Sequence, residues 1–174
     1  VVRSTKVQAP HLEKANSLAL IIRAGAGTNT IDVDHASAKG IYVANCPGKN
    51  AIAVAELAIG HLINADRRIA DNVACLREHQ WAKKEFGKAK GLYGRTLAVL
   101  GGGKIGQEVI ARAQAFGMKV NLWSRSLTPE RAEQLGVNFA ASPLEACQQA
   151  DAVSVHLAAN ADTHHLINEE ILSA

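Results

Sequence analysis

The stretch that decides the fold is residues 96–123, which read TLAVLGGGKIGQEVIARAQAFGMKVNLW. It begins with the apolar run Leu97–Leu100, continues through a glycine turn, and closes on a second apolar run, Met118–Trp123. Between the turn and Gly117, apolar residues recur at helical spacing, which predicts an amphipathic helix that begins near Lys104. The apolar residues of this helix are Ile105, Val109, Ile110, Ala113 and Phe116. The predicted order is therefore strand, turn, helix, strand.

The turn itself, GGGKIG at residues 101–106, matches the G-x-G-x-x-G pattern of dinucleotide-binding βαβ units. In that pattern Gly101 permits a tight turn, Gly103 lets the backbone approach a pyrophosphate, and Gly106 lets the helix pack closely on the strand. The first amides of the helix, at Lys104 and Ile105, can then face the anion. The alternative is a glycine turn that binds nothing, but the strand before it and the helix after it favour a dinucleotide site.

Cofactor preference is read from the end of the second strand, Trp123-Ser124-Arg125-Ser126. An NAD site usually presents Asp or Glu there to the ribose 2′-hydroxyl, and this chain has a hydroxyl followed by a guanidinium. Arginine can bind a 2′-phosphate through a bidentate fork, whereas an aspartate would repel it. We therefore predict an NAD(P) site that favours NADP(H) over NAD(H). The alternative is that Arg125 is only a solvated loop arginine.

Elsewhere, apolar runs alternate with helical patterns, which predicts an α/β fold: a Rossmann-like parallel sheet with helices on both faces. The predicted strands are Leu18–Ile22, Ile41–Ala44, Leu97–Leu100, Met118–Trp123 and Ala152–Leu157. Helical spacing from Ala51 to His79, interrupted at Asp66-Arg67-Arg68, predicts one long helix or two end to end. Residues 78–94 are rich in lysine and glycine and are predicted to be a surface connection. A helix is predicted to begin at Asn168 and to run to Ala174.

The composition is that of a globular chain of 174 residues, 48% of them hydrophobic and 20% charged. The net charge is only +3 and the basic residues are dispersed, so nucleic acid is not an expected partner. The lysines near Trp81 are interpreted as a solvated loop. They are Lys83, Lys84, Lys88 and Lys90. Lys83 could still help to bind a substrate phosphate across a dimer.

Cysteine and histidine spacing predicts neither a disulfide framework nor a metal site. Cys46, Cys75 and Cys147 lie far apart, as expected for a reducing cytoplasm. The pair His164-His165 has no carboxylate or cysteine at ligand spacing. No apolar run is long enough to span a bilayer, and no signal peptide is recognisable. We therefore expect a cytoplasmic protein without membrane contact, and the first residue, Val1, suggests a truncated chain.

Short motifs spread through nearly the whole chain resemble those of a known protein family. They are residues 2–7 (VRSTKV), 23–27 (RAGAG), 31–32 (ID), 40–41 (GI), Asn45, Pro47, 55–57 (AEL), 101–106 (GGGKIG) and 155–157 (VHL). The chain resembles the D-isomer-specific 2-hydroxyacid dehydrogenases, most closely the D-3-phosphoglycerate dehydrogenases. The resemblance implies that residues 1–46 are the later part of a smaller, flavodoxin-like substrate domain. It implies that residues 47–174 are an incomplete NAD(P)-binding Rossmann domain.

The resemblance also implies roles for individual residues. Backbone amides of the Arg23-Ala24-Gly25-Ala26-Gly27 loop would hold the substrate carboxylate, and Arg3 and Arg23 would face a dianionic substrate. Alternatively, these arginines are surface ion-pair partners. His156, Leu157 and Ala158 would lie on the cofactor side, which makes His156 no acid–base catalyst. The helical stretch from Ala51 to His79 would link the domains and form a homodimer.

Two departures from the family pattern stand out: Ser124 replaces the acidic residue after the second strand, and Ala158 replaces a usual proline. The first shifts the cofactor preference and the second loosens a contact near the nicotinamide ribose. The family's arginine, glutamate and histidine of catalysis are expected beyond Ala174. No catalytic residue is therefore assigned in this chain, which alone is predicted to be inactive.

The sequence leaves three hypotheses about function. The first hypothesis is an NAD(P)-dependent oxidoreductase fragment that transfers a hydride between the cofactor and a D-2-hydroxy acid. Its substrate would be 3-phosphoglycerate, converted to 3-phosphohydroxypyruvate in serine biosynthesis. The second keeps the enzyme but makes glyoxylate or hydroxypyruvate the substrate. The third, from another class, is a dinucleotide-sensing co-repressor module without turnover.

Overall fold

A computed structural model describes residues 1–173 and divides the chain into two compact units. The first unit comprises Val1–Ala51 and Ala158–Asn160. The second comprises Ile52–Leu157 and the residues from Ala161 onward. Each unit has its own hydrophobic core.

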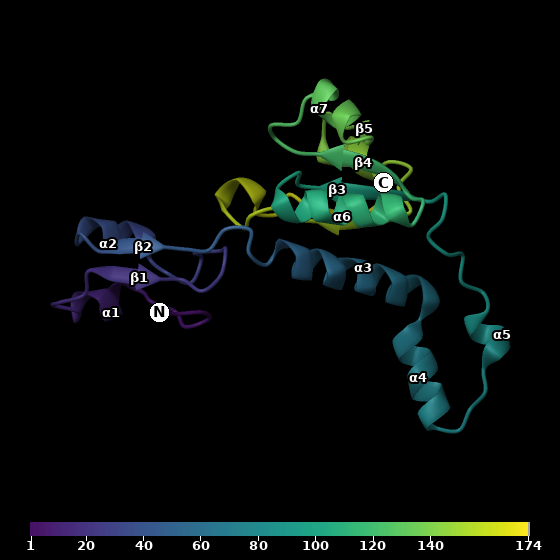
Figure 1. Cartoon of the computed structure of the whole chain (residues 1–174), viewed down its shortest axis with the longest axis horizontal. Coiled ribbons are helices and arrows are strands. Elements are labelled where there is room, and N and C mark those ends of the chain that lie inside the picture. The colour runs from purple at the N-terminus through teal and green to yellow at the C-terminus, as the bar shows by residue number, and fades with distance from the viewer. Residues whose placement is uncertain (174) are drawn as a thin grey trace. The chain divides into compact units, whose positions relative to one another are not determined.

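The second unit is built on four parallel strands in the order β5-β4-β3-β6 (Figure 1). Their bounds are β3 Thr96–Leu100, β4 Lys119–Trp123, β5 Asn138–Phe139 and β6 Ala152–Val155. From β3 the chain runs outward through β4 and β5, and then returns to the other side of β3 as β6. In open α/β sheets, ligands bind where the strand order reverses in this way, at the carboxyl ends of the strands. Here that point lies between β3 and β6.

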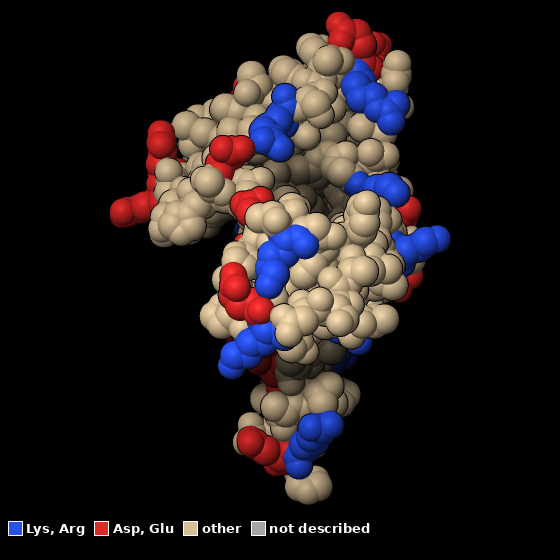
Figure 2. All heavy atoms as spheres, turned by 90° about the vertical axis from the view of Figure 1, so that its left-hand side faces the viewer, with Lys and Arg blue, Asp and Glu red and all other residues tan. Residues whose placement is uncertain are grey.

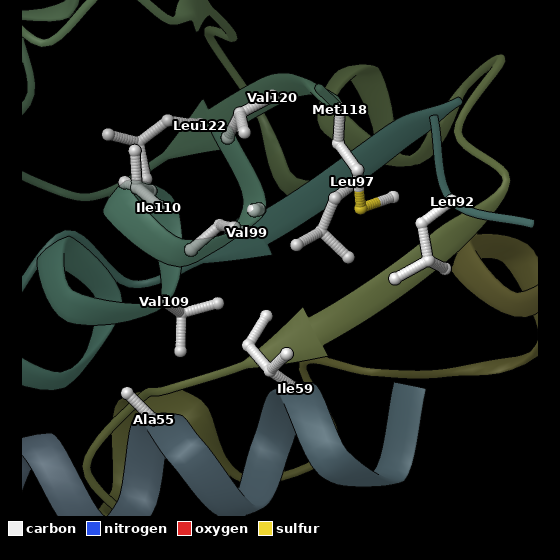
Figure 3. Packing of buried hydrophobic residues seen from close by; sticks show 11 residues of the cluster. Ala55, Ile59, Leu92, Leu97, Val99, Val109, Ile110, Met118, Val120 and Leu122 are labelled. Carbon is white, nitrogen blue, oxygen red and sulfur yellow. The ribbon is translucent and has the colours of Figure 1, made fainter. Parts of the chain in front are cut away.

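Helices cover both faces of this sheet, as predicted. On one face α3 (Ala51–Arg67) and α6 (Lys104–Ala115) pack against the strands, and Figure 3 shows their side chains converging in one core. The residues of this core are Ala55, Ile59, Leu92, Leu97, Val99, Val109, Ile110, Ala113, Met118, Val120 and Leu122. On the other face, α8 (Pro143–Cys147) and α9 (Glu169–Leu172) cover Ala98 and Leu100 of β3. The central strand is thus apolar on both sides because both sides are covered.

Phe116, the last apolar residue of the predicted helix, is the C-cap of α6. Phe116 is 45% exposed, because α6 ends at Ala115 and the chain turns away at Gly117, whose φ is 72°. Val109, Ile110 and Ala113 are buried as expected.

The helical stretch from Ala51 is two helices, α3 and α4 (Ile69–Arg77). They are separated by Arg68, whose φ of 50° lies in the left-handed region that ends an α-helix. The predicted surface connection that follows contains a short helix, α5 (Lys83–Phe86), and one core residue, Leu92. The prediction of a surface connection does not hold at Leu92, which packs in one core with residues of β3 and β4.

Three short elements between β4 and β6 were not predicted. They are α7 (Pro129–Gln134), β5 and α8, and both helices carry a local start signal. Thr128 and Ser142 each precede a proline, and their side chains accept hydrogen bonds from the amides of Arg131 and Glu145. The elements are too short to show a clear apolar period.

The first unit contains α1 (Ala9–Glu13), β1 (Leu20–Ile22), α2 (Val33–Ala38) and β2 (Tyr42–Ala44). β1 and β2 pair in parallel, and parallel bridges join Val2 to Arg23 and Val7 to Ile31. Its core consists of Leu12, Ile21, Ile31, Ala36 and Ile41. This unit, too, is a parallel α/β structure.

The predicted final helix is observed as α9, which Asn168 caps by accepting a hydrogen bond from the amide of Ile171. Ala174, where we predicted that this helix continues, lies outside the described residues. Within residues 1–173, no helix is both long and apolar enough to cross a membrane.

Candidate functional site

The first half of the glycine turn is held against the ends of the neighbouring strands. The Gly101 amide donates to the Trp123 carbonyl (2.8 Å), and the His156 amide donates to the Leu100 carbonyl (2.8 Å). Gly101 has a φ of 113°, and a Cβ on it would stand 2.5 Å from the His156 carbonyl oxygen. Only glycine fits this position without displacing backbone.

The other two glycines of the motif differ in what surrounds them. A Cβ on Gly106 would collide with the Gly101 carbonyl oxygen, so this glycine allows α6 to pack onto the turn. A Cβ on Gly103 would meet nothing within 4 Å. The turn therefore has an open position at Gly103, where the motif predicts that a pyrophosphate lies against the backbone.

The amino end of α6 suits an anion. Gly103 caps the helix, the first turn carries no acidic residue, and Lys104 is exposed there. The first amides of an α-helix have no partner within the helix and carry part of the helix dipole. The Gln107 side chain donates to the Gly102 carbonyl (3.0 Å) and braces the turn beneath this end. A dinucleotide pyrophosphate fits this chemistry, with Gly103, Lys104 and Ile105 around it.

Ser124 and Arg125 follow β4 directly, beside the turn. A Cβ on Gly102 would lie 3.4 Å from the Ser124 Cβ and 3.6 Å from its Oγ, so the Ser124 side chain lies next to the turn. Arg125 is 70% exposed and its Nη1 lies 3.2 Å from Oδ2 of Asp162, which is 72% exposed. The structure thus places Ser124 next to the turn, and it gives Arg125 an acidic partner that sequence spacing did not indicate.

His156 follows β6 at the carboxyl edge of the sheet. Its Nε2 lies 2.7 Å from the Ser154 Oγ, and burial lowers the pKa of His156 below the ordinary value of 6.5. The imidazole is therefore neutral near pH 7, as a hydrogen-bonding side chain next to a cofactor would be. Leu157 lies against the turn, because its Cδ2 would be 3.2 Å from a Cβ on Gly101. Ala158 follows and is exposed.

The predicted carboxylate loop lies in the first unit, and its amides are not equally available. Three of them already donate to carbonyls: Arg23 to Ala44 (2.7 Å), Ala24 to Val2 (2.8 Å) and Gly25 to Arg23 (2.8 Å). Among the hydrogen bonds of residues 1–173, no acceptor is engaged by the amides of Ala26 and Gly27. If this loop holds a carboxylate, these two amides are the ones that can do so.

The two predicted substrate arginines belong to segments that a parallel bridge joins. The bridge between Val2 and Arg23 places Arg3 beside the loop, although 20 positions separate the arginines in the chain. Arg3 is exposed, and no ion pair within the described part of the chain includes either residue. The Arg23 Nη1 donates to the Ala24 carbonyl (3.0 Å), while its Nε is buried without a hydrogen-bond partner. Substrate contact and surface ion pairing both stay predictions for these two arginines.

The histidine pair and the lysine-rich segment were also considered in the sequence. His164 and His165 contact each other with ring centroids 3.9 Å apart, and no three metal-ligating side chains come together within residues 1–173. Lys88 pairs with Glu85, which also pairs with Arg68. Figure 2 shows acidic and basic side chains interspersed over the face that it presents.

The fold and this site together define a class: a dinucleotide-binding α/β domain whose glycine turn opens onto the amino end of a helix. Comparison with known proteins gives the family. The model of the D-isomer specific 2-hydroxyacid dehydrogenase NAD-binding domain matches residues 59–174. The chain belongs to this family.

Similar proteins within the family differ in the substrate that they are named for. A D-3-phosphoglycerate dehydrogenase of Methanocaldococcus jannaschii is 43% identical over 98% of this chain and 32% of its own length. A hydroxypyruvate reductase of Thermotoga maritima is 42% identical over 99% of this chain and 55% of its own. A glyoxylate reductase of Thermococcus litoralis is 36% identical over 96% and 52%. The chain spans about a third to about half of these relatives.

Solved structures agree with the fold. A Granulicella formate dehydrogenase superposes with a TM-score of 0.88 at 27% identity, over 97% of this chain and 45% of that one. An acyclic imino acid reductase in complex with NADPH and D-Arg superposes with a TM-score of 0.85 at 28% identity, over 99% of this chain and 54% of that one.

Proposed function

We propose that this chain is the cofactor-binding part, with a portion of the substrate-binding part, of an NAD(P)-dependent oxidoreductase acting on a D-2-hydroxy acid. The observation that carries the proposal is the glycine turn, open at Gly103 and closed by backbone at Gly101 and Gly106. A bound nicotinamide would supply the hydride chemistry. Residues of this chain would bind and orient it: the turn at the pyrophosphate, Ser124 and Arg125 at the adenine ribose, and the segment from His156 to Ala158 near the nicotinamide.

The proposed substrate is 3-phosphoglycerate, whose C2 hydroxyl would be oxidised to the ketone of 3-phosphohydroxypyruvate on the route to serine. Support comes from the first unit, where the residue next to Arg3 bridges to Arg23 and neither arginine forms an ion pair within residues 1–173. Two guanidinium groups suit a substrate with a carboxylate and a phosphate. In this proposal residues 1–46 belong to a substrate domain, and residues 47–174 to the nucleotide domain.

A second substrate class is favoured by similarity alone. The hydroxypyruvate and glyoxylate reductases resemble this chain almost as strongly as the phosphoglycerate enzyme does. Those substrates carry no phosphate. Dependence of substrate affinity on the phosphate group would therefore separate the two proposals.

We also propose that the site favours NADP(H). A carboxylate is absent at Ser124, where it would accept from the 2′-hydroxyl of NAD and repel a 2′-phosphate. The imino acid reductase of similar fold is itself complexed with NADPH. A charge-assisted contact from Arg125 would add about 1.5 to 3 kcal/mol, or roughly ten- to a hundredfold in affinity.

The test is titration of NADP⁺ and NAD⁺ into the wild-type chain and Ser124→Asp, followed calorimetrically at low salt. Ser124→Asp should reverse the preference, because the new carboxylate accepts from the ribose hydroxyl and repels the phosphate. Ser126→Asp is the matched control, since it adds the same charge at an exposed position two residues further on. Equal affinity of the wild type for both cofactors would refute the NADP preference. Binding of neither would refute the proposed function.

A further inference from the structure

One acidic residue beside the cofactor site has no role in what is described above. Asp162 lies in η1 (Ala161–Thr163), a short 3₁₀ helix in the segment that follows β6. Its Oδ2 lies 3.2 Å from the Nη1 of Arg125, so the loop after β6 contacts the loop after β4. Both residues belong to the second unit, in segments that follow β4 and β6, the two strands that flank β3.

We propose that Asp162 weakens the preference for NADP(H) by competing with a 2′-phosphate for Arg125; this inference rests on the proposed dinucleotide site. A carboxylate and a phosphate are the same kind of partner for a guanidinium, because both offer oxygens to its planar fork. Asp162 already occupies Nη1. A 2′-phosphate must therefore displace it or share Arg125 with it, and the two anions repel each other.

The exposure of the pair makes the competition mild. Arg125 and Asp162 are 70% and 72% exposed, so solvent screens their attraction and little packing holds them. The carboxylate can therefore be displaced, and NADP(H) still binds. NAD(H), which lacks the 2′-phosphate, leaves the ion pair intact.

Ser124 stands at the position where such sites usually have Asp or Glu. Asp162 supplies a carboxylate near the same site. It does so from a different element, at a position 38 residues further along the chain (162 − 124). The usual acidic residue accepts a hydrogen bond from the ribose hydroxyl, whereas the Asp162 carboxylate contacts the Arg125 guanidinium. The structure thus assigns to Asp162 a lowering of NADP(H) affinity that leaves NAD(H) affinity unchanged.

The experiment measures dissociation constants of NADP⁺ and NAD⁺ for the wild-type chain and Asp162→Asn, with thermal melting to confirm the fold. We expect NADP⁺ to bind about two- to fivefold more tightly to the variant, the range for an exposed ion pair. NAD⁺ affinity should not change. In an Arg125→Gln background the gain should shrink, because the competition acts through Arg125.

A matched control is Glu133→Gln, which removes an exposed negative charge from α7 in the same unit. It should leave both affinities as they are. If Asp162→Asn leaves NADP⁺ affinity unchanged, or raises NAD⁺ affinity equally, the role of Asp162 is refuted while the dinucleotide site stands. If the wild type binds neither cofactor, the proposed function fails, and this inference fails with it.

Discussion

Two glycines separated by three positions have different tasks in this site. Gly106 is needed by the fold, because any side chain there collides with the Gly101 carbonyl oxygen. Gly103 has space around it and a φ of −71°, which any residue can adopt, so its lack of a side chain serves only what approaches the turn. Within one motif, Gly106 is therefore expected to matter for stability and Gly103 for ligand binding.

Gly103→Ala should keep the melting temperature of the wild type and weaken dinucleotide binding at least about tenfold, because the methyl group occupies the open position. Gly106→Ala should destabilise the chain by about 1 to 3 kcal/mol through overpacking. Thermal melting and cofactor titration on both variants check this. Unchanged cofactor affinity in Gly103→Ala would argue against a pyrophosphate at the turn.

His156 should make stability depend on pH. Burial holds its pKa in the folded chain below 6.5, the ordinary value that applies when the chain is unfolded. The unfolded state therefore binds more protons as the pH falls below 6.5, and stability is lost until the pH passes below the folded pKa. His156→Gln should flatten this part of the profile while keeping a group that can bond to Ser154. Urea midpoints between pH 8 and pH 5 measure the effect, and an identical slope in the variant would contradict it.

At the scale of elements, α4 is a helix of nine residues with no buried side chain. Ile69, Val73 and Leu76 lie at helical spacing and are 47%, 41% and 46% exposed, and no residue of α4 is buried. Clustered apolar surface of this kind marks an interaction site in soluble proteins. We propose that α3 and α4 form the interface of a homodimer.

Val73→Asp should raise the dimer dissociation constant at least about tenfold, because each copy loses apolar burial worth about 1.5 to 3 kcal/mol. Sedimentation equilibrium measures the change. Ala74→Asp, on the same helix and also exposed, is the control that adds the charge beside the apolar face. A folded wild-type monomer at high concentration would rule out this interface.

At the scale of the whole molecule, we propose that the residues assigned in this chain bind cofactor and substrate, and that proton transfer to the substrate depends on groups not assigned in it. His156 is placed for hydrogen bonding, and the family's arginine, glutamate and histidine are not among the residues assigned here. We expect the 174-residue chain to bind cofactor and to show no measurable turnover of 3-phosphoglycerate. The assay follows NAD(P)H absorbance, with Gly103→Ala as background. Turnover above that background would show that the catalytic groups lie within this chain.

Much of the site could be predicted because it is local in sequence. The turn, its helix and the strand that ends at Trp123 lie within 28 residues (123 − 96 + 1). Backbone contacts within that unit or at its edge explain why Gly101 and Gly106 must be glycine. The short elements α7, β5 and α8 were missed, since two to six residues show no apolar period. Their stability comes from caps and from packing on the sheet.

The sequence by itself determined the parallel α/β class, the glycine turn and the absence of a carboxylate at Ser124, because these depend on residue type and short spacing. Only the tertiary structure decided that Asp162 meets Arg125, that Arg3 lies beside the Arg23 loop, and that three of that loop's amides are already engaged. Apart from the hydrogen bond from Gly25 to Arg23, these contacts join segments about 20 to 40 positions apart, which the fold brings together. Spacing along a chain carries no such information, because the fold and not the sequence interval sets those distances.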